Sequence, residues 1–281
     1  MSSQPAGEIK TVGVVGAGRM GQPIIGHLAR KGFEVRVHDV DPGKQAAVRE
    51  RGGKWAGDPA ALAGECDAIL ICVGYDRELR ELLSARGLFK APRRDTIVAI
   101  LSTVLPETVQ DLAGAARPLG VHVVDATVCR GGWAADEGTL LSFVGGSAEI
   151  VARLRPVLAA YSSDIVHTGA AGTAQAAKAV NNMIMWACLV ADHEALALAH
   201  RYGLDIEMLR KALLTTHSTN GALENWGKQT MAWADDDMEI VAAMAGKRGL
   251  ALKQADAVRE ICRTLKPRRY QLDKFGSAEK G

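Results

Sequence analysis

The stretch TVGVVGAGRMGQPIIGHLARKGFEVRVHD, residues 11–39, decides the fold of this chain. It opens with a β-branched run at 11–16, which predicts a buried strand. A helical pattern follows to about Lys31, Gly32 ends it, and EVRVHDV at 34–40 predicts a second strand. A strand, a glycine-rich turn, a helix and a strand in close succession are typical of a dinucleotide-binding unit.

The turn GAGRMG has the pattern GxGxxG. We expect Gly16 to make the tight turn, Gly18 to let the backbone approach a pyrophosphate, and Gly21 to let helix and strand pack closely. The N–H groups that open the helix would then face the phosphates. The alternative is a tight strand-to-helix turn without a ligand. The predicted cofactor contacts in this turn are Gly16, Ala17, Gly18, Arg19, Met20 and Gly21.

Asp39 lies at the end of the second predicted strand. A carboxylate there accepts hydrogen bonds from a ribose 2′-hydroxyl and repels a 2′-phosphate, which favours NAD over NADP. Arg36 leaves NADP open as the less favoured cofactor, because a nearby arginine accommodates that phosphate. The alternative role for Asp39 is a helix cap before Pro42 and Gly43.

Further strands alternate with helices along the first part of the chain. The predicted strands are 68–74, 96–101, 121–124, 141–144 and 165–167, with helices that include 77–84 and 107–117. This alternation predicts an α/β fold with a doubly wound parallel Rossmann sheet. Ligands are expected beyond the carboxyl ends of its strands, near 72–78, 102–103 and 129–130.

Strand patterns vanish after Gly172. One helix of about thirty residues is predicted at 173–202, with shorter helices at 206–215, 237–245 and 250–265 and loops at Gly221, Gly227 and Asp235–Asp237. We therefore predict an NAD-binding Rossmann domain at 1–167 and an all-helical substrate and dimerisation domain at 168–281, joined by the long helix. That helix is apolar nearly all round between Met183 and Leu198, so it is buried by its own domain or by another subunit, and we expect a homodimer or higher homo-oligomer.

The junction reads GAAGTAQAAKAVNN, residues 169–182. Lys178 and Asn182 are four positions apart and share one face of the predicted helix. An amine and an amide side by side can address one small substrate. The alternative is a solvated lysine beside an asparagine that makes a local hydrogen bond.

Composition excludes several classes of protein. The net charge of +2 does not indicate binding to nucleic acid. The five cysteines are scattered along the chain, which predicts free thiols without a metal site. The opening MSSQPAGEIK lacks the apolar core of a signal peptide, and no apolar run is long enough for a membrane span. We expect a cytoplasmic protein.

Four segments together resemble the β-hydroxyacid dehydrogenase family, which includes 3-hydroxyisobutyrate dehydrogenase and tartronate semialdehyde reductase. The first is GAGRMGQPI at 16–24. The second, DATVCRGGWAADEGTL at 125–140, is similar to the family segment DAPVSGGxxGAxxGTL, and the third, 169–182, to GxGxxxKxxNN. The fourth is Lys247, where the family has lysine and aspartate and this chain has Lys247-Arg248.

The resemblance implies roles in the transfer of a hydride between nicotinamide and a small β-hydroxyacid or its semialdehyde. Lys178 matches the catalytic lysine, which protonates the carbonyl oxygen in reduction and takes the hydroxyl proton in oxidation. A free lysine is protonated near neutral pH, so the base role needs desolvation or a nearby cation, which Lys247 would supply. Asn182 would hold the substrate carboxylate or hydroxyl. The cofactor contacts implied outside the glycine turn are Val73, Gly74, Glu78, Thr103 and Lys247.

The substrate segment departs from the family at Cys129 and Arg130, where the family has serine and glycine. A thiol is a poor donor, so Arg130 could take over the binding of an anionic group. The sulfolactaldehyde reductases resemble this chain in having an arginine after a small residue at this point, which suggests a sulfonate or a second acidic group on the substrate. The alternatives are that Arg130 points to solvent or pairs with Asp136 or Glu137. The predicted substrate contacts are Cys129, Arg130, Gly131, Asn182 and Lys247.

Two other functions stay open. An imine reductase would share the fold, but that class usually lacks the catalytic lysine, and Lys178 argues against it. A catalytically silent cofactor-binding protein is the second, and it rests on Arg248 and the altered substrate segment.

Overall fold

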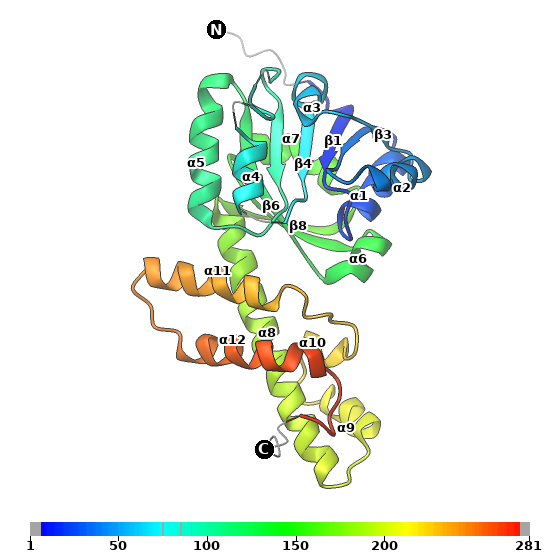
Figure 1. Ribbon diagram of the computed structural model, residues 1–281, viewed down its shortest axis with the longest axis vertical. Coiled ribbons are helices and arrows are strands. Elements are labelled where there is room, and N and C mark those ends of the chain that lie inside the picture. Colours follow the sequence, from blue (N-terminus) through cyan, green and yellow to red (C-terminus); the bar gives the residue numbers. More distant parts are fainter. Residues whose placement is uncertain (1–6, 75, 85, 91, 276–281) are drawn as a thin grey trace. The chain divides into compact units, whose positions relative to one another are not determined.

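A computed structural model describes residues 7–74, 76–84, 86–90 and 92–275 (Figure 1). The chain forms two compact units, of which the first ends at Lys178 and the second begins at Ala179. The division lies inside one continuous helix, α8 (Thr173–Arg201). The domain boundary predicted at 167–168 stays a prediction.

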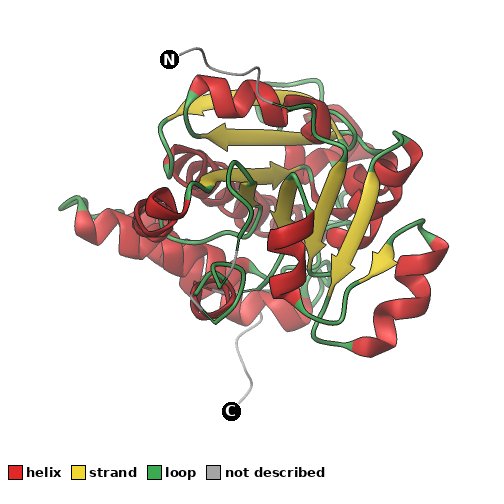
Figure 2. Ribbon diagram, turned by 90° about the horizontal axis from the view of Figure 1, so that it is seen from above, coloured by secondary structure: helices red, strands yellow, loops and turns green. Residues whose placement is uncertain are grey.

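The first unit is built on one eight-stranded sheet with the order β3-β2-β1-β4-β5-β6-β7-β8. The strand direction turns steadily across the sheet (Figure 2). The strands are β1 (Thr11–Val15), β2 (Glu34–His38), β3 (Lys54–Trp55), β4 (Ala68–Ile71), β5 (Ile97–Ile100), β6 (His122–Cys129), β7 (Leu140–Gly145) and β8 (Ser162–Gly169). All neighbours up to β6 pair in parallel, whereas β7 pairs antiparallel with β6 and parallel with β8. The predicted doubly wound sheet is confirmed, and it is mostly parallel, with one antiparallel pairing, β6 with β7, among the described strands.

Alternate residues of the central strands face two separate apolar cores. Val12 and Leu70 face one core, whereas Ile69 and Ile100 face the other. Both cores are closed by helices, as a mainly parallel sheet requires. The helices are α1 (Gly21–Arg30), α2 (Gln45–Glu50), α3 (Pro59–Glu65), α4 (Asp76–Leu82), α5 (Pro106–Ala116), α6 (Gly131–Glu137) and α7 (Ala148–Leu158), with 3-10 turns at Pro42–Lys44 and Arg117–Leu119.

β6 is longer than the strand predicted at 121–124. Its antiparallel pairing with β7 runs from Asp125 opposite Gly145 to Cys129 opposite Leu141. Asp125 therefore lies inside the strand and not at its end. β3 was not expected, because two paired residues leave no periodic pattern in a sequence.

The second unit contains the remainder of α8 and shorter helices. These are α9 (Ile206–Leu213), α10 (Gly221–Glu224), α11 (Ala234–Lys247) and α12 (Lys253–Leu265), with a 3-10 turn at Lys266–Arg268. The loops predicted at Gly221 and at Asp235–Asp237 are wrong. Asn220 caps α10, and the three aspartates fill the first turn of α11, where negative charge is favourable. Across the described residues, no helix combines the length and the apolar character needed to cross a membrane.

A buried histidine holds the last described segment of this unit against α8. The His193 Nδ1 lies 2.7 Å from the Leu189 carbonyl oxygen, and the Tyr270 backbone N–H donates to His193 Nε2 at 3.0 Å. The ring must therefore be neutral, with its proton on Nδ1.

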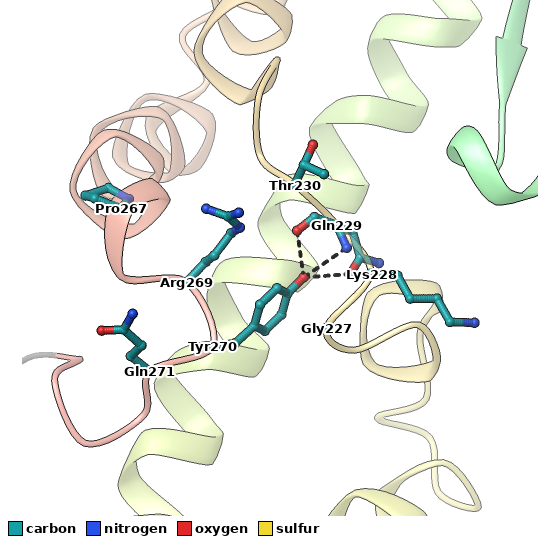
Figure 3. A pocket seen from close by; sticks show the side chains of 8 residues that line it. All are labelled: Gly227, Lys228, Gln229, Thr230, Pro267, Arg269, Tyr270 and Gln271. Carbon is teal, nitrogen blue, oxygen red and sulfur yellow. Dashed lines mark hydrogen bonds between the residues drawn. The ribbon is translucent and has the colours of Figure 1, made fainter. Parts of the chain in front are cut away.

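The Tyr270 hydroxyl donates to Gln229 Oε1 at 2.9 Å beside a pocket of about 300 Å³ (Figure 3). The pocket is lined by Gly227, Lys228, Gln229, Thr230, Pro267, Arg269, Tyr270 and Gln271.

This contact predicts loss of stability in mild acid. Burial lowers the pKa of His193, against a smaller opposing effect of the Leu189 carbonyl. The unfolded chain therefore takes up the proton first, and stability falls as the pH drops below the ordinary histidine value of about 6.5. We expect His193→Gln to flatten the decrease in unfolding free energy between about pH 7.5 and about pH 5.5, measured by urea denaturation. Replacement of the exposed His217 by Gln is the control, and an equal pH dependence in wild type and His193→Gln would contradict the assignment.

Candidate active site

The carboxyl ends of five parallel strands meet at one edge of the sheet in the first unit. The segments that leave this edge carry most of the residues singled out in the sequence. They are Gly16–Gly21 after β1, Asp39 after β2, Val73 and Gly74 after β4, Thr103 after β5, and Cys129–Gly131 at the end of β6. The structure thus brings these residues to the edge where a doubly wound sheet binds its ligands.

The glycine turn has the geometry of a phosphate cradle. Gly16 has φ +98°, and a Cβ there would collide with the Cys72 carbonyl oxygen. A Cβ on Gly21 would collide with the carbonyl oxygen of Gly16, whereas a Cβ on Gly18 would have no heavy atom within 4 Å. Two glycines are therefore required by the fold, and the third leaves open space beside the start of α1. That space fits the pyrophosphate of a dinucleotide.

Asp39 is buried behind this turn. Its carboxylate accepts from the Ala17 N–H at 2.7 Å and the Asp41 N–H at 2.9 Å, and the Lys44 ammonium donates to both oxygens. Burial favours the neutral acid, but these donors outweigh it and lower the pKa of Asp39. The adjacent Val40 is 93% exposed. The cap near Pro42 is Asp41, which accepts from the Gly43 N–H at 2.9 Å, and not Asp39.

The segments after β4 and β5 are held by side chains from elsewhere. Glu78 accepts the Gly74 N–H at 3.1 Å, so its carboxylate supports this loop. The Ser102 hydroxyl donates to the Val73 carbonyl oxygen at 2.7 Å. The predicted contact Thr103 follows Ser102 directly and so lies at the same edge.

The start of α8 is fixed to β6 by a buried carboxylate. Asp125 is fully buried and accepts the N–H groups of Gly172 and Gln175 at 2.8 and 2.9 Å. Burial raises the pKa of Asp125, against the opposing effect of these backbone donors. A carboxylate is well placed at a helix N-terminus, where N–H groups lack partners.

Two further buried side chains, Thr127 and Gln175, hold the same turn of α8. The Thr127 hydroxyl donates to the Ala174 carbonyl oxygen at 3.1 Å. The Gln175 side chain accepts the Val104 N–H at 2.9 Å and donates to the Ser102 carbonyl oxygen at 2.8 Å. Gln175 therefore clamps the loop that contains Thr103.

Lys178 lies less than one turn beyond Gln175 on α8 and reaches the end of β6. Its ammonium donates to the Val128 carbonyl oxygen at 2.8 Å and lies 3.9 Å from the Cys129 sulfur. One of its three N–H donors is thus occupied by the backbone, which orients the group and leaves two donors for other partners. The Lys178 side chain is partly buried, and its role stays a prediction.

Arg130 turns away from the helix that follows it. The residue adopts φ +83°, a left-handed conformation that costs a residue other than glycine about 1–2 kcal/mol. Its guanidinium donates to Asp164 Oδ2 at 2.7 Å, to the Ser163 hydroxyl and to the Thr139 carbonyl oxygen. The pairing considered with Asp136 or Glu137 is therefore wrong, and the binding of a substrate anion by Arg130 stays a prediction.

The glycine turn and the substrate segment are joined by an ion pair. Arg19 makes two hydrogen bonds to Asp136 on α6, at 2.9 and 2.6 Å. A Cβ on Gly132 would lie within 2.7 Å of the Arg19 guanidinium, so the two segments are closely packed. Gly131 opens α6 with φ +75°.

The remaining predicted residues belong to the second unit. Asn182 follows Lys178 by one turn of α8 and accepts from the Asn181 amide at 3.1 Å. Lys247 is the last residue of α11. No group of histidine, cysteine and acidic side chains suited to a metal ion occurs among the described residues.

Sequence reasoning missed the residues that position the site, namely Asp125, Gln175 and Lys44. Each is a polar side chain whose partner is a group outside its own helix or strand. Only Asp125 had a usable signal, because a carboxylate in an otherwise apolar strand needs a buried partner.

Comparison with known proteins identifies the family. The family described as the NAD binding domain of 6-phosphogluconate dehydrogenase matches residues 11–169, more than half of the chain. The chain belongs to the β-hydroxyacid dehydrogenase family. A second family model, described as NAD-binding of NADP-dependent 3-hydroxyisobutyrate dehydrogenase, matches residues 172–275. The resemblance found in the four sequence segments is thus confirmed.

The chain is similar to named members of the β-hydroxyacid dehydrogenase family. The 3-hydroxyisobutyrate dehydrogenase of Pseudomonas aeruginosa is 31% identical over 255 residues, which cover 88% of this chain and 86% of that protein. The mitochondrial 3-hydroxyisobutyrate dehydrogenase of Mus musculus is 32% identical over 203 residues, 72% of this chain and 61% of that protein. The chain thus spans about 60% of the length of the mitochondrial relatives that it matches.

Several solved structures share the fold of this chain. A structure of Mycobacterium tuberculosis 3-hydroxyisobutyrate dehydrogenase with L-serine has a TM-score of 0.85 at 23% identity, and the match covers 96% of this chain and 100% of that one. An imine reductase from Myxococcus stipitatus has a TM-score of 0.67 at 20% identity, covering 92% and 94%. The fold alone therefore does not separate the two enzyme classes.

Two alanine variants separate the structural glycines of the turn from the one that faces open space. We expect Gly21→Ala to lower the unfolding free energy by about 1–3 kcal/mol, because its Cβ has no room. Gly18→Ala should stay within about 0.5 kcal/mol of wild type in stability. It should nevertheless weaken NADH binding about tenfold or more, measured by fluorescence titration, because the methyl group fills the cradle. Unchanged NADH affinity in Gly18→Ala would contradict the assignment of the cradle.

Proposed function

We propose that this chain is an NAD(P)-dependent oxidoreductase that interconverts a small β-hydroxyacid and its semialdehyde. The observation that carries the proposal is the Lys178 amine, fixed 2.8 Å from the Val128 carbonyl oxygen at the same sheet edge as the glycine turn. A proton donor and a dinucleotide cradle at one edge are what such a reaction requires.

The cofactor would be held by the glycine turn, Asp39 and the loops after β4 and β5. NAD is proposed over NADP because the Asp39 carboxylate favours a ribose hydroxyl. When bound, the nicotinamide supplies or accepts the hydride. The assigned contacts are Gly16, Ala17, Gly18, Arg19, Met20, Gly21, Asp39, Val73, Gly74, Glu78, Thr103 and Lys247.

Lys178 is assigned as the general acid and base. Val128 fixes one N–H of the ammonium, so a second N–H can point to the substrate oxygen. In reduction the ammonium gives its proton to the developing alkoxide, and in oxidation the neutral amine removes the hydroxyl proton. Asp125 and Gln175 act through Lys178, because they set the position of the turn that carries it.

The substrate is assigned to Cys129, Arg130, Gly131, Asn182 and Lys247. Arg130 can bind an anionic group of the substrate only if its guanidinium leaves Asp164, because it donates to that carboxylate at 2.7 Å. The exchange is open to it, since both side chains are partly exposed, at 37% and 52%, and exposed ion pairs are weak. A second acidic group on the substrate would compete with Asp164 directly.

The other two functions have less support. An imine reductase is disfavoured because Lys178 and Asn182 occupy the positions of the hydroxyacid motif. A catalytically silent protein would not need an amine oriented by a backbone carbonyl. Exposed apolar side chains recur along α8 at Val180, Ile184 and Leu198 and directly after it at Tyr202, which suits contact with a second copy of the chain. The homodimer and the cytoplasmic location stay predictions.

Removal of the amine tests the assigned chemistry. We expect Lys178→Ala to lower NADH-linked turnover about a hundredfold to ten-thousandfold, the usual contribution of a general acid. NADH binding, measured by fluorescence titration, should remain within about twofold of wild type because the amine lies outside the cradle. Lys31→Ala, at an exposed lysine after α1, is the matched control. Normal turnover by Lys178→Ala would refute the role.

A substrate panel tests Arg130. We would compare 3-hydroxyisobutyrate, 3-hydroxypropionate, glycerate and a sulfonate analogue in wild type, Arg130→Gly and Asp164→Asn. If Arg130 binds a second anionic group, Arg130→Gly should raise the KM for the sulfonate about tenfold. Asp164→Asn should lower the same KM, because the Arg130 guanidinium is released from its ion pair. Equal KM values in all three proteins would leave Arg130 as a surface ion pair only.

A further inference from the structure

We propose that Lys44 competes with the cofactor ribose for Asp39. It thereby lowers the affinity of the site for NAD relative to its affinity for NADP. The inference rests on the proposed function, because it assumes that Asp39 faces the adenosine ribose. It concerns a specificity-determining residue that lies outside the glycine turn.

The Asp39 carboxylate is saturated by donors from the protein itself. Oδ2 accepts the Ala17 N–H at 2.7 Å and the Lys44 ammonium at 3.0 Å, and Oδ1 accepts the Asp41 N–H at 2.9 Å and the same ammonium at 3.1 Å. A carboxylate offers about four lone-pair sites, two on each oxygen. All of them are used, so a ribose hydroxyl gains a place on Asp39 only when Lys44 withdraws.

The two backbone donors cannot withdraw, but Lys44 can. Ala17 belongs to the glycine turn, and Asp41 is held in the 3-10 turn that its own side chain caps. The Lys44 side chain is 31% exposed, whereas that of Asp39 is 5% exposed. Lys44 therefore covers the buried carboxylate from the solvent side, and its flexible stem lets the ammonium swing outwards.

Lys44 is also the cation best placed for a 2′-phosphate. Arg36, the residue that first suggested tolerance of NADP, is engaged with Glu34 at 3.3 Å and with Glu65. Its charge is therefore already balanced. The Lys44 ammonium neutralises the carboxylate that would repel the phosphate, and it can donate to that phosphate without leaving the neighbourhood of Asp39.

The two cofactors thus make opposite demands on one side chain. NAD must displace Lys44 to bring its hydroxyls to Asp39, which weakens NAD. NADP retains Lys44 as a partner, which strengthens NADP. Removal of the ammonium should therefore tighten binding of the unphosphorylated ribose and weaken binding of the phosphorylated one.

Calorimetric titration with ADP-ribose and 2′-phospho-ADP-ribose tests this on the full chain, because these probes isolate the adenosine end of the cofactor. We expect Lys44→Met to raise the ratio of the two affinities in favour of ADP-ribose about tenfold or more. Lys44→Arg should keep the wild-type ratio of the two affinities, since it retains the positive charge. Lys54→Met is the matched control, because Lys54 pairs with Glu34 at 3.1 Å on the neighbouring strand.

An affinity ratio in Lys44→Met within about twofold of wild type would overturn the inference, and so would an equal loss for both probes. NADH-linked turnover, measured in parallel, separates this failure from failure of the proposed function. Turnover with an unchanged ratio removes only the role of Lys44. Absence of both probe binding and turnover in wild type removes the proposed function, and the inference with it.

Discussion

The arrangement of the site depends on one buried carboxylate. Asp125 projects from β6 and accepts two N–H groups at the start of α8, which would otherwise lack partners. This contact sets both the height and the rotation of the helix. A shift by one residue would rotate Lys178 by about 100° and carry its amine away from Val128. Thr127 and Gln175 secure the same turn, so a side chain on a long helix acquires a fixed position.

Local signals were sufficient for the parts of the fold that depend on neighbours in the chain. The strand, turn and helix from Thr11 to Arg30 could be predicted because three glycines and a β-branched run act within a short stretch. The same holds for α8, whose uninterrupted pattern predicted its first residue, Thr173. Lys178 could be singled out because its motif is contiguous, and the family identified by comparison is the one that this motif suggested.

The features that escaped prediction depend on contacts that a local sequence pattern does not contain, most of them between residues far apart in the sequence. β6 continues to Cys129 because β7 pairs with it in the opposite direction, and a hydrophobic pattern does not contain strand direction. The partner of Arg130 is Asp164, on a strand two places along the sheet, so the sequence suggested nearer carboxylates instead. A partly exposed lysine such as Lys44 carries no periodicity, and its contact with Asp39 appears only in the folded chain.

The place where α8 passes from one unit to the other has a consequence for protein engineering. The first unit ends at Lys178, so the amine and every group that orients it, Asp125, Gln175 and Val128, are carried by one module. Asn182 and Lys247 are carried by the other. A chimera joined immediately after Lys178 would therefore exchange the helical second unit for that of a relative while keeping the Lys178 amine together with the contacts that orient it. The two units can thus be recombined without separating Lys178 from Asp125, Gln175 and Val128.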